Sequence, residues 1–443
     1  MMKLSKLITI FILSLNIGIA AAATTSFKLD NGLKVILLPD HRSPIVHIQM
    51  WYKIGSGYEP NGITGISHAL EHMMFNGTTK FPKYIESLSK LGNTNTNAST
   101  YVDWTYYKQT VPKSNLEKVL ELEADRMQNL RFEEKTFKNE MAAVLEERKM
   151  RVDDSPISLA RERFHAAAFV SNPYHHPVIG WEGDIKQYTI EDAKAWYNKW
   201  YAPNNAILVI GGDFQEQQIK NLIGQHFNSI PKKKLPAIKS KLAQKPLIEK
   251  HLEVALPVMA DHLMIGFITP SIKQLEEKDH WQIYALEALS YALGLYEDGI
   301  LVEKLKQKDK LVSQIGVSYS GTYLHNTLFM IDATLLPKAK LEKIASTIKN
   351  QLIKLKLRPI SEERLTRIKN LIEADYIYNQ DSIVQKTTTI GSLAALDLPI
   401  NFLEDHVINI QKVTAKQIQQ VAQLYFDNSI TMLIHANGSR LTN

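Results

Sequence analysis

The 443-residue chain has no cysteine, so no disulfide bond can form within it. It also has little excess charge, because 52 Lys and Arg residues stand against 46 Asp and Glu residues, a formal net charge of +6. The basic residues are dispersed except at residues 232–234, a run more typical of a solvated linker, so no nucleic-acid footprint is indicated. Apolar residues make up 44% and charged residues 22%, which is ordinary for a globular protein and argues against extensive disorder.

Long apolar runs are missing too, except at the N-terminus. Lys3 and Lys6 precede an apolar run over residues 7–19, and the small residues 21–23 follow it. A basic start, a short apolar core and a small-residue site are typical of a secretory signal peptide over residues 1–23. A membrane anchor is the alternative, but the run is short for a bilayer span. We therefore predict an exported protein of a bacterial periplasm, with no membrane span in its mature form.

Hydrophobic periodicity predicts an α+β fold, with helices packed on a largely antiparallel sheet. Residues 26–38 alternate around Asp30-Asn31-Gly32, which predicts a hairpin of two strands. The other strands expected in the first half lie at residues 45–52, 96–111 and 206–210. Besides one around residues 68–72, the helices expected there lie at residues 116–129, 134–152 and 190–200.

The chain is too long for one ordinary core, and an internal echo indicates a duplicated domain. The helix–linker–strand pattern that starts at Thr189 recurs at Thr414 with a constant offset of 225 residues. Such units are common, so coincidence is the alternative. We predict an N-terminal domain over residues 24–230, a Lys- and Pro-rich linker over residues 231–250, and a C-terminal domain over residues 251–443.

The most informative motif is His68-Ala69-Leu70-Glu71-His72, an H-x-x-E-H pattern in a stretch expected to be helical. Positions i and i+4 of an α-helix lie one above the other, so His68 and His72 can direct two imidazoles at one metal ion. Glu71 lies on an adjoining strip, within reach of a water on that metal. An isolated His pair at this spacing is more often a surface or core feature, but H-x-x-E-H is the signature of one metallopeptidase class.

A catalytic zinc site needs three protein ligands and an open position for water. The helix-favouring segment 139–148 offers three glutamates as candidates. Glu140 and Glu147 are almost two turns apart and face the same way, whereas Glu146 is rotated from Glu147 by about 100°. We predict Glu147 as the third ligand and Glu140 as a carboxylate that orients a ligating histidine. Geometry alone leaves Glu146 as the alternative ligand, and a Glu-rich helix is otherwise usually a solvated face.

The chain further resembles the pitrilysin-type (inverzincin) zinc metallopeptidases, in particular the half-length members related to the mitochondrial processing peptidase. Besides the two motifs above, the segments that carry this resemblance are residues 55–59, 65–67, 74–78, 97–100, 103–107, 201–205 and 211–214. The resemblance implies two homologous domains, each a mainly antiparallel sheet covered by helices, which together form a bowl-shaped half-chamber.

The resemblance also implies roles for individual residues. His68, His72 and Glu147 match the ligands of Zn²⁺, and Glu71 matches the catalytic base. Glu140 matches a second acidic residue on the ligand helix. Three residues, Asn97, Ala98 and Thr100, match the edge strand against which this family lays its peptide substrate. The chemistry is not repeated in the second half, because the helix expected over residues 279–293 contains His280 but no H-x-x-E-H.

The second half departs from the family pattern in one respect. Catalytically complete members usually carry an Arg and a Tyr there, and the corresponding positions hold Lys306 and Ser313. Lysine lacks the planar fork of arginine, and serine cannot reach as far as a phenol. Either the alignment is shifted or these groups are absent. We therefore hypothesise that the protein is the zinc-bearing subunit of a two-subunit peptidase, with a homologous partner or a second copy supplying them.

The sequence thus predicts an exported zinc endopeptidase that hydrolyses extended or unfolded peptides. Two other function classes stay open. One is a non-catalytic peptide-binding or scaffold subunit of the same family, and the other is a zinc hydrolase that uses the same ligands on small amides.

Overall fold

The computed structural model describes residues 24–237, 248–295, 297–337 and 339–436. The predicted signal peptide and residues 238–247 of the predicted linker lie outside the described residues. Within the described ranges, no helix is both long enough and apolar enough to cross a bilayer.

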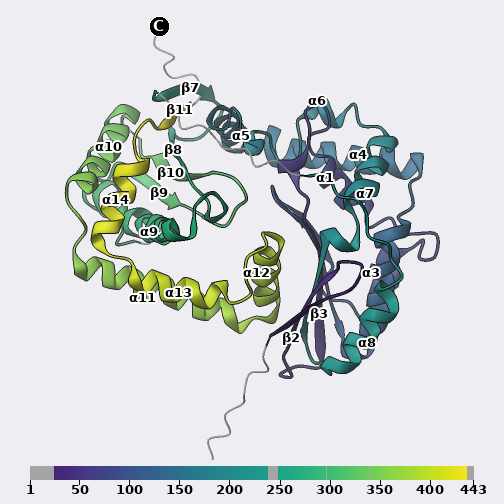
Figure 1. The fold of residues 1–443 in the computed structure, drawn as a ribbon. Helices are drawn as coiled ribbons and strands as arrows, with labels where there is room; N and C mark the ends of the chain where they lie inside the picture. Colours follow the sequence, from purple (N-terminus) through teal and green to yellow (C-terminus); the bar gives the residue numbers. More distant parts are fainter. Residues whose placement is uncertain (1–23, 238–247, 296, 338, 437–443) are drawn as a thin grey trace, which may run out of the picture.

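The first half of the chain builds a six-stranded sheet in the order β1-β2-β6-β3-β5-β4 (Figure 1). β2 and β6 run parallel, and all other neighbouring strands run antiparallel. The predicted hairpin over residues 26–38 is confirmed as β1 and β2, which turn at Gly32 with a φ of +96°. The strand bounds are β1 (Thr25–Lys28), β2 (Lys34–Pro39), β3 (Ile45–Tyr52), β4 (Asn97–Thr100), β5 (Thr105–Pro112) and β6 (Ala206–Gly212).

The α-helices of this half are α1 (Ile66–Met73), α2 (Tyr84–Lys90), α3 (Leu116–Asn129), α4 (Glu134–Arg148), α5 (Pro156–Ala168), α6 (Glu182–Ile185), α7 (Ile190–Trp200) and α8 (Glu216–Phe227). The predicted helix over residues 134–152 is α4 extended by one wide π-helical turn, Lys149–Asp153.

The second half builds a five-stranded sheet in the order β7-β11-β8-β10-β9, again with one parallel pair, β7 and β11. These strands repeat β2-β6-β3-β5-β4 in order and direction. The echo in the sequence has a structural counterpart, because α7 and α14 both start with a capping box, at Thr189 and Thr414. The strand bounds are β7 (Lys250–Leu256), β8 (His262–Thr269), β9 (Val312–Ser318), β10 (Thr327–Leu335) and β11 (Ile430–Ala436).

The α-helices of the second half are α9 (Trp281–Ser290), α10 (Leu341–Leu357), α11 (Glu362–Asp381), α12 (Ile383–Ala395), α13 (Phe402–Lys412) and α14 (Ala415–Tyr425). The predicted fold class, α+β with two repeated units of helices on a mainly antiparallel sheet, is therefore confirmed.

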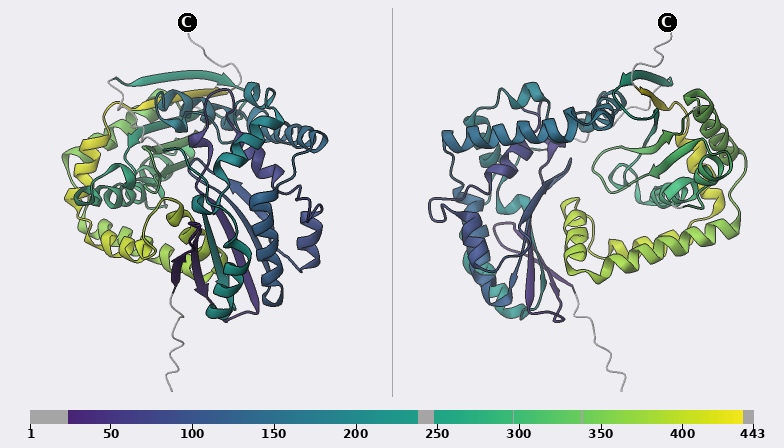
Figure 2. Two further views of the ribbon diagram at one scale, coloured as in Figure 1. Left: turned by 45° about the vertical axis from the view of Figure 1, so that its right-hand side comes forward. Right: turned by 180° about the vertical axis from the view of Figure 1, so that it is seen from behind.

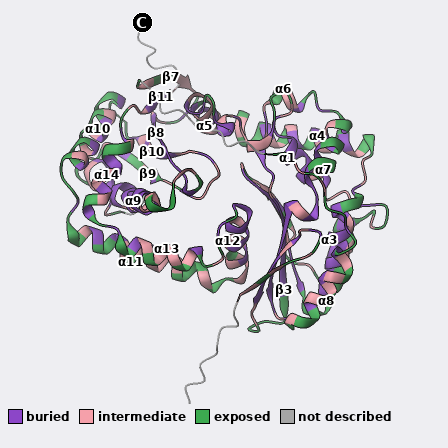
Figure 3. Cartoon of the chain, viewed as in Figure 1, coloured by how far each residue is buried: buried purple, intermediate pink, exposed green. Residues whose placement is uncertain are grey.

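The central strands of the first sheet, β2, β6 and β3, are buried at most positions on both faces (Figure 3). β2 and β6 are correspondingly apolar at nearly every position. Val35 and Leu37 of β2 belong to the core shared with the helices of the first half. Ile36 of β2 points to the opposite face, since side chains alternate along a strand, and there it joins Ile390 and Leu393 of α12. A helix of the second half thus covers the inner face of the first sheet.

The exchange is reciprocal, because α5 of the first half covers the second sheet (Figure 2). Phe164 of α5 is fully buried among Met264, Ile268 and Met330 of that sheet. Its ring occupies the space above Gly266, where a β-carbon would lie 2.9 Å from the ring. The two halves are therefore joined by two helices as well as by the chain between them.

Candidate metal centre

The N-terminus of α1 is fixed by buried contacts before the motif begins. Gly65 has a φ of +89°, and a β-carbon there would lie 2.3 Å from the carbonyl oxygen of Ile179, so only glycine fits. The carboxylate of Glu59 accepts hydrogen bonds from the backbone N–H groups of Gly65 and Ser67, at 2.6 and 2.8 Å. These bonds satisfy donors that every helix start leaves unpaired, and they fix the direction in which α1 projects His68 and His72.

α1 and α4 bring the two histidines and Glu147 together. Nε2 of His72 lies 3.2 Å and Nε2 of His68 lies 3.6 Å from the same oxygen of Glu147, Oε2. One donor atom from each of the three residues lies within 4.8 Å of the others. In the part of the chain that the structure describes, no other group of His, Cys, Asp and Glu meets this criterion.

The two separations that involve Glu147 fit zinc. Tetrahedral zinc with bonds of about 2.0–2.1 Å holds its ligand atoms about 3.3 Å apart, close to the two distances observed. Two imidazoles and one carboxylate are also a ligand set that catalytic zinc uses, with one position left for water. The side chain of Glu146, the alternative ligand, is 71% exposed and pairs with Lys149.

Two further charged side chains contact the ligand candidates. Oε2 of Glu140 lies 3.5 Å from Nδ1 of His72, on the ring edge opposite Glu147, where the sequence places it. Arg151, which the sequence analysis did not single out, pairs with the second oxygen of Glu147 at 2.7 Å. The sequence did contain an indication of this ion pair, because Glu147 and Arg151 stand at i and i+4. Both groups restrict the rotation of a ligand side chain.

The surroundings shift the pKa values of the two histidines in opposite directions. Burial lowers the pKa of His68 to about 3, and the neighbouring His72 and Arg151 act in the same direction, so its imidazole is neutral at pH 7. For His72, burial lowers the pKa, but Glu140, Glu147 and Glu71 together raise it above its ordinary value. Binding a metal through His72 requires its neutral imidazole, so a bound cation would take the place of a proton on this ring.

A cavity of about 700 Å³, the metal-side cavity, is lined by Glu71, the metal-ligand candidates and β4. Thr100 donates a hydrogen bond of 2.5 Å to Oε2 of Glu71. Burial raises the pKa of Glu71 above its ordinary value, and this hydrogen bond partly opposes the rise. A carboxylate with a raised pKa beside a metal site is suited to accept a proton.

β4, which contains Asn97, Ala98 and Thr100, is an edge strand that pairs only with β5. The backbone of Ala98 bonds to its neighbours' side chains: its N–H donates to Oδ1 of Asn97 at 2.8 Å, and its carbonyl accepts from Oγ of Ser99 at 2.7 Å. The unpaired side of an edge strand is a template for pairing with another chain. The structure thus brings all the predicted site residues to one cavity.

Comparison with known proteins identifies the family. A zinc protease of Helicobacter pylori, PqqE, is 30% identical over 413 residues, which cover 91% of this chain and 90% of that protein. The family model "Insulinase (Peptidase family M16)" matches residues 34–181. The chain belongs to peptidase family M16. A second model, "Peptidase M16 inactive domain", matches residues 187–372, in agreement with a second half that lacks the metal motif.

Solved structures of related proteins have the same fold. A protease from Helicobacter pylori superposes with a TM-score of 0.86 at 29% identity, covering 93% of this chain and 99% of that one. The periplasmic protease PqqL from Escherichia coli superposes with a TM-score of 0.78 at 18% identity. That match covers 94% of this chain but 48% of PqqL, so this M16 chain corresponds to about half of that protein.

The two positions that depart from the family pattern lie elsewhere in this M16 chain. Nζ of Lys306 pairs with Glu297 at 2.7 Å, and Oγ of Ser313 donates to the carbonyl of Thr334 at 3.2 Å. Neither residue is among those that line the cavity with Glu71. The side chains of Lys306 and Ser313 are therefore bonded to other residues of the second half.

Proposed function

We propose that this M16 protein is a zinc-dependent endopeptidase that hydrolyses extended or unfolded peptides. The observation that carries the proposal is the convergence of His68, His72 and Glu147 within 4.8 Å, beside Glu71 in one cavity. Relatives named zinc proteases support the same reading.

His68, His72 and Glu147 would hold the zinc ion. When bound there, zinc supplies Lewis acidity, which polarises a peptide carbonyl and makes a water molecule more acidic. Glu71 accepts a proton from the attacking water and later passes it to the leaving amine nitrogen. We assign this transfer to Oε1, because Oε2 is held by the hydroxyl of Thr100. Glu140 and Arg151 keep the ligand side chains in place.

The peptide would be held by β4. An extended peptide that adds a strand to this edge would replace the side-chain bonds of Asn97 and Ser99 to the backbone of Ala98 with backbone hydrogen bonds. Such pairing requires an extended backbone, so unfolded peptides are favoured over folded proteins. Because Thr100 at the end of the strand donates a hydrogen bond to Glu71, a peptide paired with β4 would have the bond to be cleaved beside Glu71.

We further propose that the chain works as the zinc-bearing member of a pair. Lys306 and Ser313 stand where the family usually has Arg and Tyr, and both are bonded within their own half. A homologous subunit, or a second copy, would supply the missing groups. PqqL, in which this fold spans about half of a longer chain, supports the idea that two such halves act together. Periplasmic export is proposed from the N-terminal segment, and PqqL is itself described as periplasmic.

The test is hydrolysis of an unstructured peptide library by the zinc-loaded protein, as a single chain and after mixing with a candidate homologous subunit. Glu71→Gln is the control: it should bind zinc with unchanged affinity and lower the turnover by at least about 100-fold. If the wild-type protein binds zinc but cleaves no peptide in either state, the protein is a non-catalytic subunit. If only small amides are cleaved, the peptidase assignment is wrong.

A further inference from the structure

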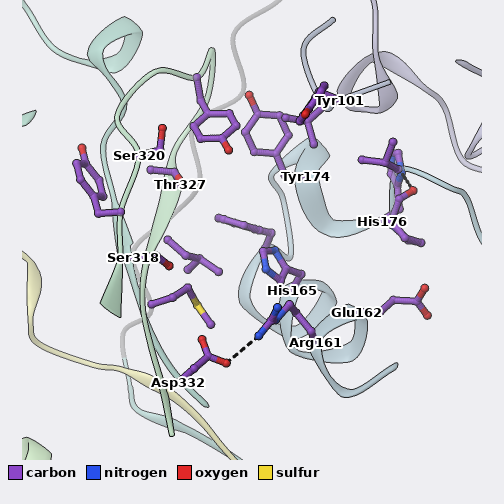
Figure 4. Close-up of a pocket in the computed structure, with 18 residues that line it drawn as sticks. Tyr101, Arg161, Glu162, His165, Tyr174, His176, Ser318, Ser320, Thr327 and Asp332 are labelled. Atoms are coloured by element: carbon purple, nitrogen blue, oxygen red, sulfur yellow. Dashed lines mark hydrogen bonds and ion pairs between the residues drawn. The ribbon is translucent and has the colours of Figure 1, made fainter. Parts of the chain in front are cut away.

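A second cavity, of about 660 Å³, lies next to the metal-side cavity (Figure 4). Helix α5 and Tyr174 line one side of it, and Ser318, Ser320 and Thr327 from the β9–β10 region line the other. It is therefore built by both halves of the chain. Tyr101 and Val178 line this cavity and the metal-side cavity alike, so the two adjoin.

The walls of this cavity are mainly apolar and include several aromatic rings. Phe169, Tyr174, Leu328 and Met330 are at most 8% exposed and belong to the core under α5, so these walls are rigid. Tyr174 contacts Phe169 edge-on at 6.3 Å between ring centroids. Tyr101, by contrast, is 47% exposed.

The end of the cavity opposite Tyr101 carries charges that neutralise one another. Nη2 of Arg161 on α5 pairs with Oδ1 of Asp332 on β10 at 3.0 Å, across the junction of the two halves (Figure 4). Burial lowers the pKa of His165, which points into the cavity between them and Tyr174, to about 4, so this ring is neutral at pH 7. A charged side chain entering here would lose its water without gaining an unpaired opposite charge.

We propose that this cavity is a specificity pocket that takes a large apolar side chain of the peptide, preferably an aromatic one. The proposal rests on the proposed peptidase function and adds its preference. Tyr101 directly follows Thr100, the residue that bonds to Glu71, so a peptide continuing along β4 passes the mouth of this pocket. Its volume lies within the range of cavities that enclose small ligands, and aromatic walls favour edge-on contacts with a further ring.

The preference is measured by binding, so that it does not depend on turnover. Zinc-loaded Glu71→Gln protein is titrated with fluorescent unstructured peptides in which a single Phe is moved along an otherwise Gly- and Ser-based sequence. Peptides with Phe at one position should bind about tenfold to 100-fold more tightly than the Ala version, as expected for burying a large apolar side chain. Lys or Glu at that position should bind no better than Ala. Equal binding of the Phe and Ala peptides would overturn the proposal.

Variants that fill the pocket with a large side chain test whether the Phe preference arises there. Ser318→Trp and, as a second variant, Ser320→Trp place an indole in the cavity from exposed positions, so no core contact is removed. Both should reduce the Phe-over-Ala preference to less than about threefold, chiefly by weakening binding of the Phe peptide. Ser346→Trp on α10, exposed and outside the cavity, is the matched control and should keep the preference. A preference that survives both pocket variants would locate it elsewhere.

The failure of each proposal is visible separately. Absence of peptide hydrolysis by the wild-type protein, with the Phe preference retained in the binding assay, would remove the peptidase function and leave a peptide-binding pocket. Peptide hydrolysis without any Phe preference in the binding assay would remove the specificity pocket and leave the peptidase function.

Discussion

The indole of Trp51 on β3 lies against the backbone of Gly391 on α12, so closely that a β-carbon at 391 would be 2.2 Å from Cε2 of the ring. Trp51 is fully buried, stacks on Tyr106 with 4.2 Å between ring centroids, and donates a hydrogen bond of 2.9 Å to Gln49. The ring therefore has no free direction in which to move. Packing against Trp51 of the first half therefore requires glycine at position 391 of α12, a helix of the second half.

Gly391→Ala should destabilise the protein by about 1–3 kcal/mol, because the added methyl group overpacks the contact with Trp51. Alanine is the better helix former, so helix propensity alone predicts the opposite sign. Gly183→Ala in α6 is the matched control, since nothing lies within 4 Å of its added β-carbon, and it should be neutral or stabilise by up to about 1 kcal/mol. Urea unfolding measures both, and equal effects would contradict the packing explanation.

Glu147→Gln should lower the zinc affinity by more than about 100-fold, because even groups that only orient a ligand typically contribute 10–100-fold. Glu146→Gln is the neighbouring control: its side chain is 71% exposed and should leave the affinity within about twofold. Competition against a chromophoric zinc chelator measures both constants. Stronger weakening by the change at 146 would reverse the ligand assignment.

Removing the metal should also lower stability. A ligand that binds only the folded state at 100 times its Kd adds about 2.7 kcal/mol, so a chelator should lower the Tm of the zinc-loaded protein, and added zinc should restore it. The Glu147→Gln protein should show a much smaller shift under the same conditions. Differential scanning calorimetry checks the effect, and a Tm that is independent of zinc in the wild-type protein would argue against the site.

Asp103, which is not one of the metal-ligand candidates, should make the stability of the folded protein depend on pH. Its carboxylate accepts hydrogen bonds from the hydroxyl of Tyr174 and the N–H of Leu324, which lies in the second half. Burial raises its pKa to about 6 despite these donors. The folded state therefore keeps this proton up to about pH 6, whereas the unfolded chain releases it near pH 4. Stability from this carboxyl is present at low pH and is lost as the pH rises through about 6.

Asp103→Asn removes this titration. As the pH rises from 4 to 7, the free energy of unfolding of the variant should increase relative to wild type by up to about 3 kcal/mol. Urea unfolding of both proteins at a series of pH values gives the difference, in which all other titrating groups cancel. A difference that stays constant with pH would show that folding does not raise the pKa of Asp103.

Much of the local structure followed from the sequence because its causes are local. The strand predicted over residues 45–52 has the bounds of β3, and the i, i+4 spacing of His68 and His72 predicted that they share a face of α1. The helix predicted over residues 190–200 has the bounds of α7, and the offset of 225 residues located its counterpart α14. Helices α10 to α13 were not predicted individually, since no motif drew attention to them.

The sequence by itself determined the chemistry available: two imidazoles and a carboxylate on one helix, further carboxylates on another, and a helix–linker–strand pattern that recurs after 225 residues. Only the tertiary structure decided that Glu147 meets both rings, that Arg151 braces it, and that α5 and α12 each cover the sheet of the other half. The physical reason is that periodicity reports whether a face is buried but not by which partner. A strand that is apolar on both faces accepts any helix of matching shape, and that match exists only once residues as distant as Trp51 and Gly391 are in contact.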